Sequence, residues 1–255
     1  MKNLLKLEFR KLKRQKSFYI CLAIMAGMLF IMGATAKVLM EYAEQIAEMP
    51  GGEVMPTTFS SFLLGFESAS SFSMLSAIFV SIVVCDDYES HTVKNIIARG
   101  YSRTAHYFSK LIYVFTATTI MFVIVVFLAG VIGGLFLGFG ELSGETILLI
   151  AGQYVVCMSG VALVFFIASS IKKLGASIAA NIIVPIVIPL LLELADTALK
   201  SESFKFADVW IDSFLRSLTV SDVSAGRILA CVLGSIAYGV AFILAGYFVN
   251  KKSEV

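Results

Sequence analysis

Charged residues are scarce in this chain, since 15% of its 255 residues are Asp, Glu, Lys or Arg and 58% are hydrophobic. A soluble domain carries roughly 25% charged residues. Six stretches contain no charge at all, and each is long enough to cross a hydrocarbon layer of about 30 Å as a helix. The composition therefore excludes a soluble domain and predicts an all-α, polytopic membrane protein. The uncharged stretches are 17–36, 68–85, 111–140, 146–171, 174–192 and 228–250.

Residue types that build catalytic or metal sites are also scarce. The two histidines, His91 and His106, fall in the same predicted loop, and neither HExxH nor GxSxG occurs. The four cysteines all lie in predicted helices without CxxC spacing, so we expect neither a disulfide nor a metal site. An intramembrane enzyme is therefore disfavoured. The cysteines are Cys21, Cys85, Cys157 and Cys231.

The chain also lacks the features that would let it use an energy source alone. It has no GxxxxGK[ST] motif for a nucleotide, and its only acid near a helix body is Glu67, toward one end of the second predicted helix. An ion-coupled carrier would ordinarily bury ionisable groups near mid-membrane. If the chain transports a substrate, the energy is expected to come from another subunit.

The few charges are distributed unevenly. Of the 20 Lys and Arg residues, 15 lie in segments 1–16, 86–110, 172–173 and 251–252, and the alternate segments hold 13 of the 18 acids. The positive-inside rule therefore predicts cytoplasmic termini, in agreement with an even number of crossings. A signal peptide cleaved after Ala34–Thr35–Ala36 is the alternative for the start. The uncharged run of 20 residues exceeds the usual apolar region of about 7 to 15 residues in such peptides.

These patterns predict one membrane domain over residues 1–255. Leu5, Phe9 and Leu12 share a helical face in the basic segment 1–16, which predicts an interfacial amphipathic helix. A basic flank that only fixes topology is the alternative. The predicted transmembrane helices are 17–39, 61–85, 111–139, 146–171, 174–194 and 227–249.

Two further segments are candidates for special roles. In the fifth predicted helix, Pro185 and Pro189 interrupt backbone hydrogen bonds and Asn181 is polar at membrane depth, which makes these three residues candidates for a substrate pathway. A simple kink, with Asn181 bonded inside its own subunit, is the alternative. Segment 193–226 carries an apolar stripe that predicts a helix lying on or dipping into the outer face. The stripe consists of Phe206, Trp210, Phe214 and Leu218.

The loop 86–110 contains a predicted short helix from Ser90 to Ala98, with Ser90 as its cap and Gly100 as its stop. Val93, Ile96 and Ile97 form an apolar face, and its exposure to water would be unfavourable. A groove in a cytoplasmic partner would cover it. The alternative is that the face docks on the chain's own helices or on lipid headgroups.

This loop carries a family resemblance. It holds an acidic residue, Glu89, then Thr92, a small residue followed by Arg103, and Lys110 at the entry to the third helix. This order resembles the ABC-2 type permeases of ATP-binding cassette transporters, although His91 stands where Gly is common and Gly100 and Tyr101 replace a Pro-containing turn. The resemblance implies a coupling helix that docks on an ATPase subunit. The implied coupling residues are Glu89, Thr92, Val93, Lys94, Ile96, Ile97 and Arg103.

The resemblance implies an exporter in the bacterial cytoplasmic membrane that moves an amphipathic substrate, such as a peptide, drug or lipid-like molecule. Its implied partners are an ABC ATP-binding subunit, which would bind ATP and Mg²⁺, a second permease copy or homologous half, and membrane lipids. No cofactor in this chain and no nucleic acid is expected. A non-transporting scaffold or sensor that recruits a cytoplasmic partner is the alternative, with an ion-coupled carrier third.

Overall fold

The computed structural model describes residues 2–12, 14–47, 58–65, 71–199, 205–219 and 223–252, and within these residues all regular structure is helical. The predicted all-α class is therefore confirmed. The helices are α1 (Lys2–Leu12), α2 (Lys16–Ala47), α3 (Phe59–Gly65), α4 (Ser71–Glu89), α5 (Thr92–Ala98), α6 (Arg103–Leu137), α7 (Gly144–Ile171), α8 (Leu174–Leu199), the 3-10 helix η1 (Ala207–Val209), α9 (Ile211–Ser217) and α10 (Ala225–Lys252).

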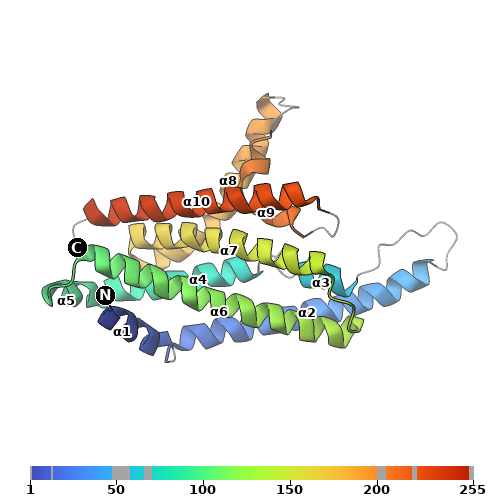
Figure 1. Ribbon diagram of the computed structural model, residues 1–255, viewed down its shortest axis with the longest axis horizontal. Coiled ribbons are helices and arrows are strands. Elements are labelled where there is room, and N and C mark those ends of the chain that lie inside the picture. The colour runs from blue at the N-terminus through green and yellow to red at the C-terminus, as the bar shows by residue number, and fades with distance from the viewer. Residues whose placement is uncertain are drawn as a thin grey trace.

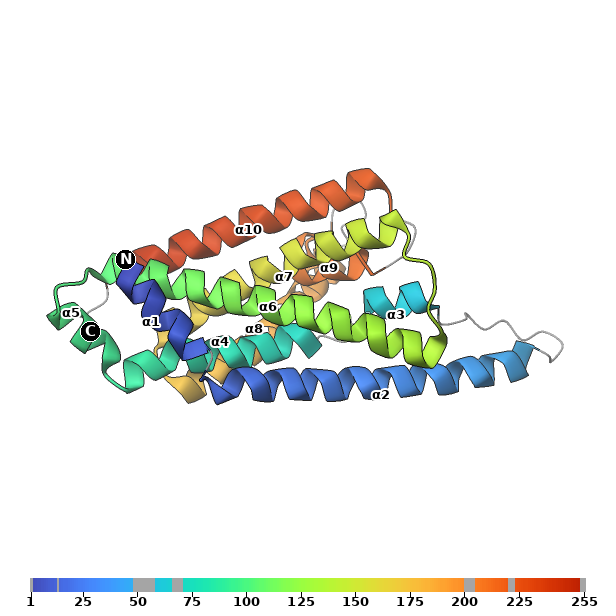
Figure 2. The same cartoon turned by 60° about the horizontal axis from the view of Figure 1, so that its bottom comes forward.

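Five helices in the described part of the chain are long and apolar enough to cross a membrane, namely α2, α6, α7, α8 and α10. Four of them, α2, α6, α7 and α10, run side by side along the long axis of the molecule (Figures 1 and 2). The shorter α4 packs against α2, α7 and α8. This arrangement is a polytopic membrane bundle, as the composition predicts.

Within the predicted crossing at 61–85 the structure describes α3 and α4. Residues 66–70, including the predicted position Glu67, lie outside the described residues. The side chains of Phe62, Leu63 and Leu64 in α3 are buried, and the Leu64 carbonyl accepts a hydrogen bond from Gln153 Nε2 of α7 at 3.0 Å. α3 thus packs on α6 and is bonded to α7, and whether one helix runs through 61–85 lies outside the described residues.

At their polar flanks, most of the helices extend past the predicted crossings. The interfacial helix ends at Leu12, and Lys16 already belongs to α2. The 35 residues of α6 span about 52 Å, well beyond a hydrocarbon layer of about 30 Å. These extensions arise because backbone hydrogen bonds continue a helix past the last apolar side chain. Ser102, whose hydroxyl accepts the Ala105 N–H at 3.1 Å, caps the polar start of α6.

The predicted outer stripe is only partly buried. Leu218 of the stripe is buried together with Ile211 and Leu215 outside it, whereas Phe206 is exposed. The Leu218 carbonyl accepts a second hydrogen bond from Gln153 Nε2, at 3.2 Å. The segment therefore packs into the end of the bundle, because an interior amide holds the end of α9 there. Trp210 and Phe214 are half-buried and contact Tyr238 of α10.

The spanning helices differ greatly in burial. α7 is the most buried of the five and α8 the least. From Ile183 onward the large aliphatic side chains of α8 are mostly exposed, and the far end of this helix stands apart from the bundle (Figure 1). Such side chains on a spanning helix face lipid or another apolar surface. α8 is thus the helix with the least packing inside its own chain.

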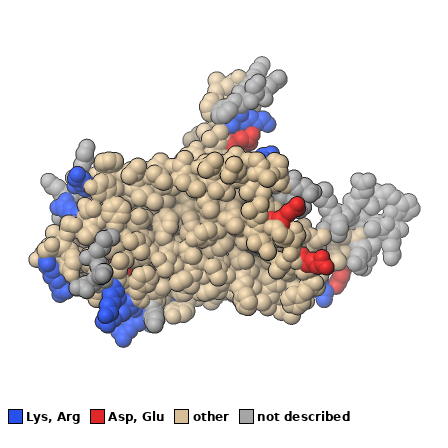
Figure 3. Space-filling model, viewed as in Figure 1, with Lys and Arg blue, Asp and Glu red and all other residues tan. Residues whose placement is uncertain are grey.

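Charge is segregated between the two ends of the bundle. Most visible Lys and Arg gather at the end that carries α5 and both marked chain ends, whereas Asp and Glu, with a few more Lys and Arg beside them, appear at the opposite end and on the far part of α8 (Figures 1 and 3). The long sides between the ends are free of visible charge in this view. The molecule therefore has an apolar belt between a basic end and an acidic end.

Candidate functional site

The start of α5 follows a sharp turn at His91. This residue has a left-handed φ of 56° and makes no side-chain hydrogen bond to the helix. The prediction that Ser90 caps the helix is wrong, since the Ser90 hydroxyl pairs with that of Thr92 at 2.8 Å. The turn at His91 delays the helix to Thr92 and places Ser90 outside it.

The end of α5 is as predicted. Gly100 has a φ of 86°, a conformation that strongly favours glycine. Its N–H donates to the Ile97 carbonyl at 2.9 Å, and the Tyr101 N–H donates to the Ile96 carbonyl at 3.4 Å. These two bonds form a Schellman motif, which satisfies carbonyls that the helix end would leave open. The short helix is therefore fixed more firmly at its end than at its start.

The predicted apolar face of α5 is only partly available to a partner. Val93 is 4% exposed and packs inside the chain, while Ile96 and Ile97 are half-buried. Lys94 and Arg99 are exposed. The expectation that no part of the chain covers this face is therefore wrong for Val93, because this side chain packs against the ends of other helices.

Two implied coupling residues make contacts within the chain. One carboxylate oxygen of Glu89 accepts the N–H of Leu174 at 2.8 Å, so an anion caps the start of α8. Arg103 is the first residue of α6 and is exposed. Glu89 thus ties the turn before α5 to α8, a contact that the sequence pattern does not reveal.

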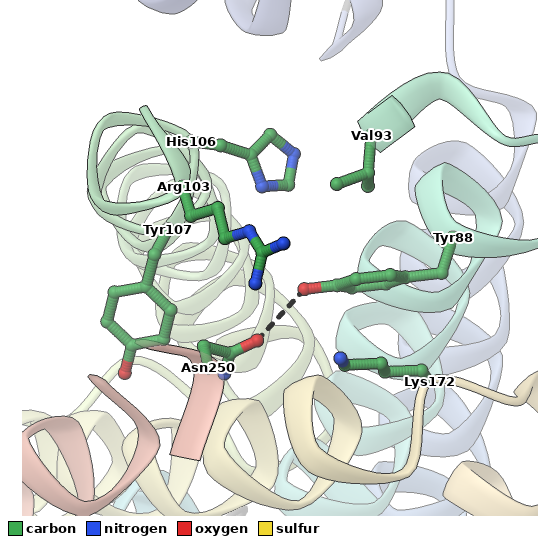
Figure 4. Close-up of a pocket in the computed structure, with 7 residues that line it drawn as sticks. All are labelled: Tyr88, Val93, Arg103, His106, Tyr107, Lys172 and Asn250. Atoms are coloured by element: carbon green, nitrogen blue, oxygen red, sulfur yellow. Dashed lines mark hydrogen bonds between the residues drawn. The ribbon is translucent and has the colours of Figure 1, made fainter. Parts of the chain in front are cut away.

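A small cavity of about 20 Å³ lies beneath Val93, with room for about one water molecule (Figure 4). The Tyr88 hydroxyl donates to Asn250 Oδ1 at 3.0 Å across it. Arg103 and Lys172 reach toward the cavity from different helix ends, and Lys172 Nζ lies 5.3 Å from the centre of the Tyr88 ring. The lining residues are Tyr88, Val93, Arg103, His106, Tyr107, Lys172 and Asn250.

The electrostatics of this cavity follow from its burial and its cations. Burial, together with the charge of Arg103, lowers the pKa of the Lys172 ammonium. Burial raises the pKa of the Tyr88 hydroxyl to about 12, and the Asp87 carboxylate adds to this increase. Tyr88 therefore stays protonated as a hydrogen-bond donor. The cavity joins the ends of α4, α6, α7 and α10 under one side chain of α5.

A buried charge cluster lies next to the cavity. Lys110 Nζ lies 2.6 Å from Asp87 Oδ2 and 3.3 Å from Glu8 Oε2, and all three side chains are buried. Lys11 Nζ lies 2.9 Å from Asp87 Oδ1. Two carboxylates and two ammonium groups therefore meet. Together they connect α1 with α4 and α6.

The cluster keeps Asp87 ionised. Burial alone would raise the pKa of the Asp87 carboxyl, but the nearby His106 ring, Lys110 and Lys11 hold that pKa well below its usual range. His106 Nε2 lies 3.8 Å from Asp87 Oδ2, beyond hydrogen-bond distance. Sequence analysis missed this cluster. The signal was present as charges that directly flank two uncharged stretches.

The predicted pathway residues lie elsewhere, on α8. Asn181 is 2% exposed, and its Nδ2 donates to Ser81 Oγ at 2.8 Å and to the Val164 carbonyl at 3.5 Å. Because a carbonyl can only accept, this contact places the amide nitrogen toward Val164. The Asn181 Oδ1 atom has no hydrogen-bond partner among the described residues. The alternative that Asn181 bonds within its own subunit is therefore correct for its nitrogen but not for its oxygen.

A larger groove of about 350 Å³ runs from Asn181 past Pro185 and Pro189 to the start of α9. Its volume is within the usual range for a ligand site. The structure thus brings together the three predicted pathway residues, although they do not approach α5 or the charge cluster in this groove. The lining residues used below are Met74, Gly160, Val161, Val164, Asn181, Ile182, Pro185, Ile186, Pro189, Asp212 and Arg216.

Comparison with known proteins gives a family match. A family model described as "ABC-2 family transporter protein" matches residues 4–196. The matched region includes α5, the charge cluster and most of α8. No curated protein matches the chain significantly.

Proposed function

The chain belongs to the ABC-2 family of transporter proteins and is a multi-pass membrane permease, and we propose that it is the membrane subunit of an ATP-driven exporter. In this proposal a separate ATP-binding subunit docks on α5, binds ATP and Mg²⁺ and supplies the energy. The basic end of the bundle faces the bacterial cytoplasm, following the positive-inside rule.

The position of α5 is the observation that supports this proposal most strongly. α5 projects from the basic end of the bundle, with Lys94 and Arg99 exposed and Ile96 and Ile97 half-buried (Figure 2). Val93 on the opposite side reaches the cavity where four helix ends meet. A displacement of α5 by a partner would therefore move several spanning helices together.

The substrate route is proposed to involve α8 and a second permease copy or homologous half. The exposed aliphatic side chains of α8 provide an apolar surface that is not covered by its own chain. Two such surfaces can face each other across a cleft suited to an amphipathic substrate, as well as to membrane lipid. Transport outward is the proposed direction.

Co-purification with the candidate ATP-binding subunit tests the proposal. The change Ile97→Glu places a charge in the half-buried face of α5 and should weaken the complex about tenfold to a hundredfold, the range expected from losing one aliphatic contact. Thr104→Glu adds the same charge at an exposed position of α6, outside α5, and is the charge-matched comparison. An Ile97→Glu variant with wild-type complex formation and wild-type ATP-dependent transport would overturn the docking role of α5.

A further inference from the structure

The groove beside α8 is apolar along its walls and charged where it meets α9. Among its described lining residues, Asp212 and Arg216 of α9 are the ones that carry charge. The apolar walls come from α7 and α8 and include Val161, Val164, Ile182, Pro185 and Ile186. The groove therefore has the polarity of an amphiphile, with an apolar length and a charged end.

The charged end lies toward the acidic end of the bundle. The Asp196 carboxylate on α8 accepts the N–H groups of Phe206 and Ala207 at 2.8 and 2.9 Å, which holds the segment before α9 against the far part of α8. Between Asn181 and Pro189 the groove follows α8 for about 12 Å. This length is close to about 15 Å, half the thickness of a hydrocarbon layer. The groove therefore extends over about one leaflet of a bilayer.

One side of the groove is open to the surroundings of the bundle. Met74 of α4 is 51% exposed and Ile186 of α8 is 63% exposed, although both line the groove. Apolar side chains that are exposed on a membrane bundle face lipid or another apolar surface. The half-buried Trp210 lines the groove beside Asp212, and Trp is enriched where a membrane meets water. An acyl chain can therefore enter from the side, with its headgroup at the level of Trp210.

The charge at this end matches a zwitterion. Arg216 Nη2 lies 2.8 Å from Asp212 Oδ2, and the two side chains are 68% and 31% exposed. An ion pair at such a site contributes little to stability, so a ligand that rearranges it loses little. Asp212 would repel an anionic headgroup and Arg216 a cationic one, whereas a zwitterionic headgroup can place the opposite charge at each.

We propose that this groove binds an acyl chain of a zwitterionic phospholipid, with the lipid phosphate at Arg216 and the lipid ammonium group at Asp212. The lipid belongs to the leaflet at the acidic end of the bundle, and its chain runs from there toward Asn181. A guanidinium has five N–H donors and a carboxylate about four acceptor sites, so both can bind a headgroup while they stay in contact. This inference goes beyond the proposed export function and needs no ATP-binding partner.

The test uses the full-length protein in nanodiscs made of equal amounts of phosphatidylethanolamine and phosphatidylglycerol. A trace of one lipid or the other carries the same diazirine on an acyl chain, so the two probes differ only in their headgroup. Labelling within 73–77, 156–164 and 182–189 is compared with labelling of 120–127 on α6, where Ile120, Val123 and Phe127 are exposed and report the bulk lipid. This ratio should favour the ethanolamine probe by about two- to fivefold, the range for one exposed ionic contact. Equal ratios for the two probes would overturn the proposal.

Two variants test the headgroup contacts. Asp212→Asn removes the charge that meets the ammonium group and should make the two probes equivalent. Arg216→Gln should reduce labelling by both probes about two- to fivefold, because both carry a phosphate. Glu141→Gln is the matched control and should keep the preference, since Glu141 is exposed and does not line the groove. A preference that survives in Asp212→Asn would overturn the proposal.

Further variants test the groove itself. Gly160→Phe should abolish groove labelling by both probes, because a Cβ there meets nothing within 4 Å and the ring enters the groove. Gly27→Phe is the matched control, since Gly27 on α2 has the same free space but does not line the groove. Groove labelling that is unchanged in Gly160→Phe would overturn the site. Disulfide formation between two copies through Ile186→Cys, without groove labelling in the wild type, would show that a second copy fills the groove and would also overturn the proposal.

Discussion

At the scale of single residues, Asp87 is central to the basic end of the molecule. It contacts Lys110 from α6 and Lys11 from α1, while Glu8 supplies the second carboxylate. Buried ion pairs gain little over well-packed apolar groups, but removal of one partner leaves an uncompensated charge. Asp87 therefore matters chiefly because its absence leaves buried ammonium groups unpaired.

We expect Asp87→Ala to destabilise the protein by about 3 to 5 kcal/mol. Asp86→Ala removes the same charge from the adjacent, exposed side chain and should change stability by less than about 0.5 kcal/mol. Thermal unfolding in detergent, with the two variants side by side, measures the difference. Equal effects of the two substitutions would mean that net charge, not the buried cluster, is responsible.

The same residue sets a pH dependence. Because the pKa of folded Asp87 lies well below its ordinary value of 3.8, its stabilising effect is complete above that value and falls as the pH drops toward the folded pKa. The unfolding midpoint of the wild type should therefore exceed that of Asp87→Asn by a constant amount between pH 7 and pH 5. The gap should narrow below about pH 4. A gap that widens on acidification would contradict the assignment.

At the scale of elements, α5 depends on the backbone at Gly100. A Cβ at this position would meet nothing within 4 Å, so its cost would arise from the positive φ alone. We expect Gly100→Ala to cost about 1 to 2 kcal/mol and to loosen the last turn of α5. Amide hydrogen exchange at position 100 and at Tyr101 should become faster, and this rate measures the loosening.

Gly175→Ala provides the comparison for this change. Gly175 lies in the first turn of α8 and also has free space around its Cβ position, but its φ is not positive. Alanine there should be neutral or should stabilise the helix by up to about 0.5 kcal/mol, because the full gain of about 0.5 to 1 kcal/mol is for a helix interior. Exchange at α5 that is as slow in Gly100→Ala as in Gly175→Ala would show that the Schellman turn does not hold this element.

The sequence predicted a helix or its end best where residues within that one segment determine it. The uncharged stretches identified the five long helices, and Gly100 identified the end of α5. Contacts between distant segments were not predictable: Gln153 of α7 donates to carbonyls at the ends of both α3 and α9, and no pattern within either segment indicates this shared partner. The same reason applies to Glu8 and Asp87, whose partners become neighbours only in the folded bundle.

At the scale of the whole molecule, the segregation of charge predicts its orientation in the membrane. Thr104 lies at the basic end and Glu141 beyond the other end of α6, and both are exposed. In a background without the four native cysteines, Glu141→Cys should react with an impermeant thiol reagent in intact cells. Thr104→Cys should react only after the membrane is opened. Labelling of position 104 in intact cells would contradict this predicted orientation.

The pairing of Glu8 with Lys110 also constrains how the protein is made. The two residues are 102 positions apart in the chain. At a synthesis rate of about 5 to 20 residues per second, Lys110 leaves the ribosome roughly 5 to 20 s after Glu8. During this interval α1 has no ionic partner on α6, and its amphipathic surface can rest at the membrane interface. α1 can therefore reach its final position only after the start of α6 has emerged.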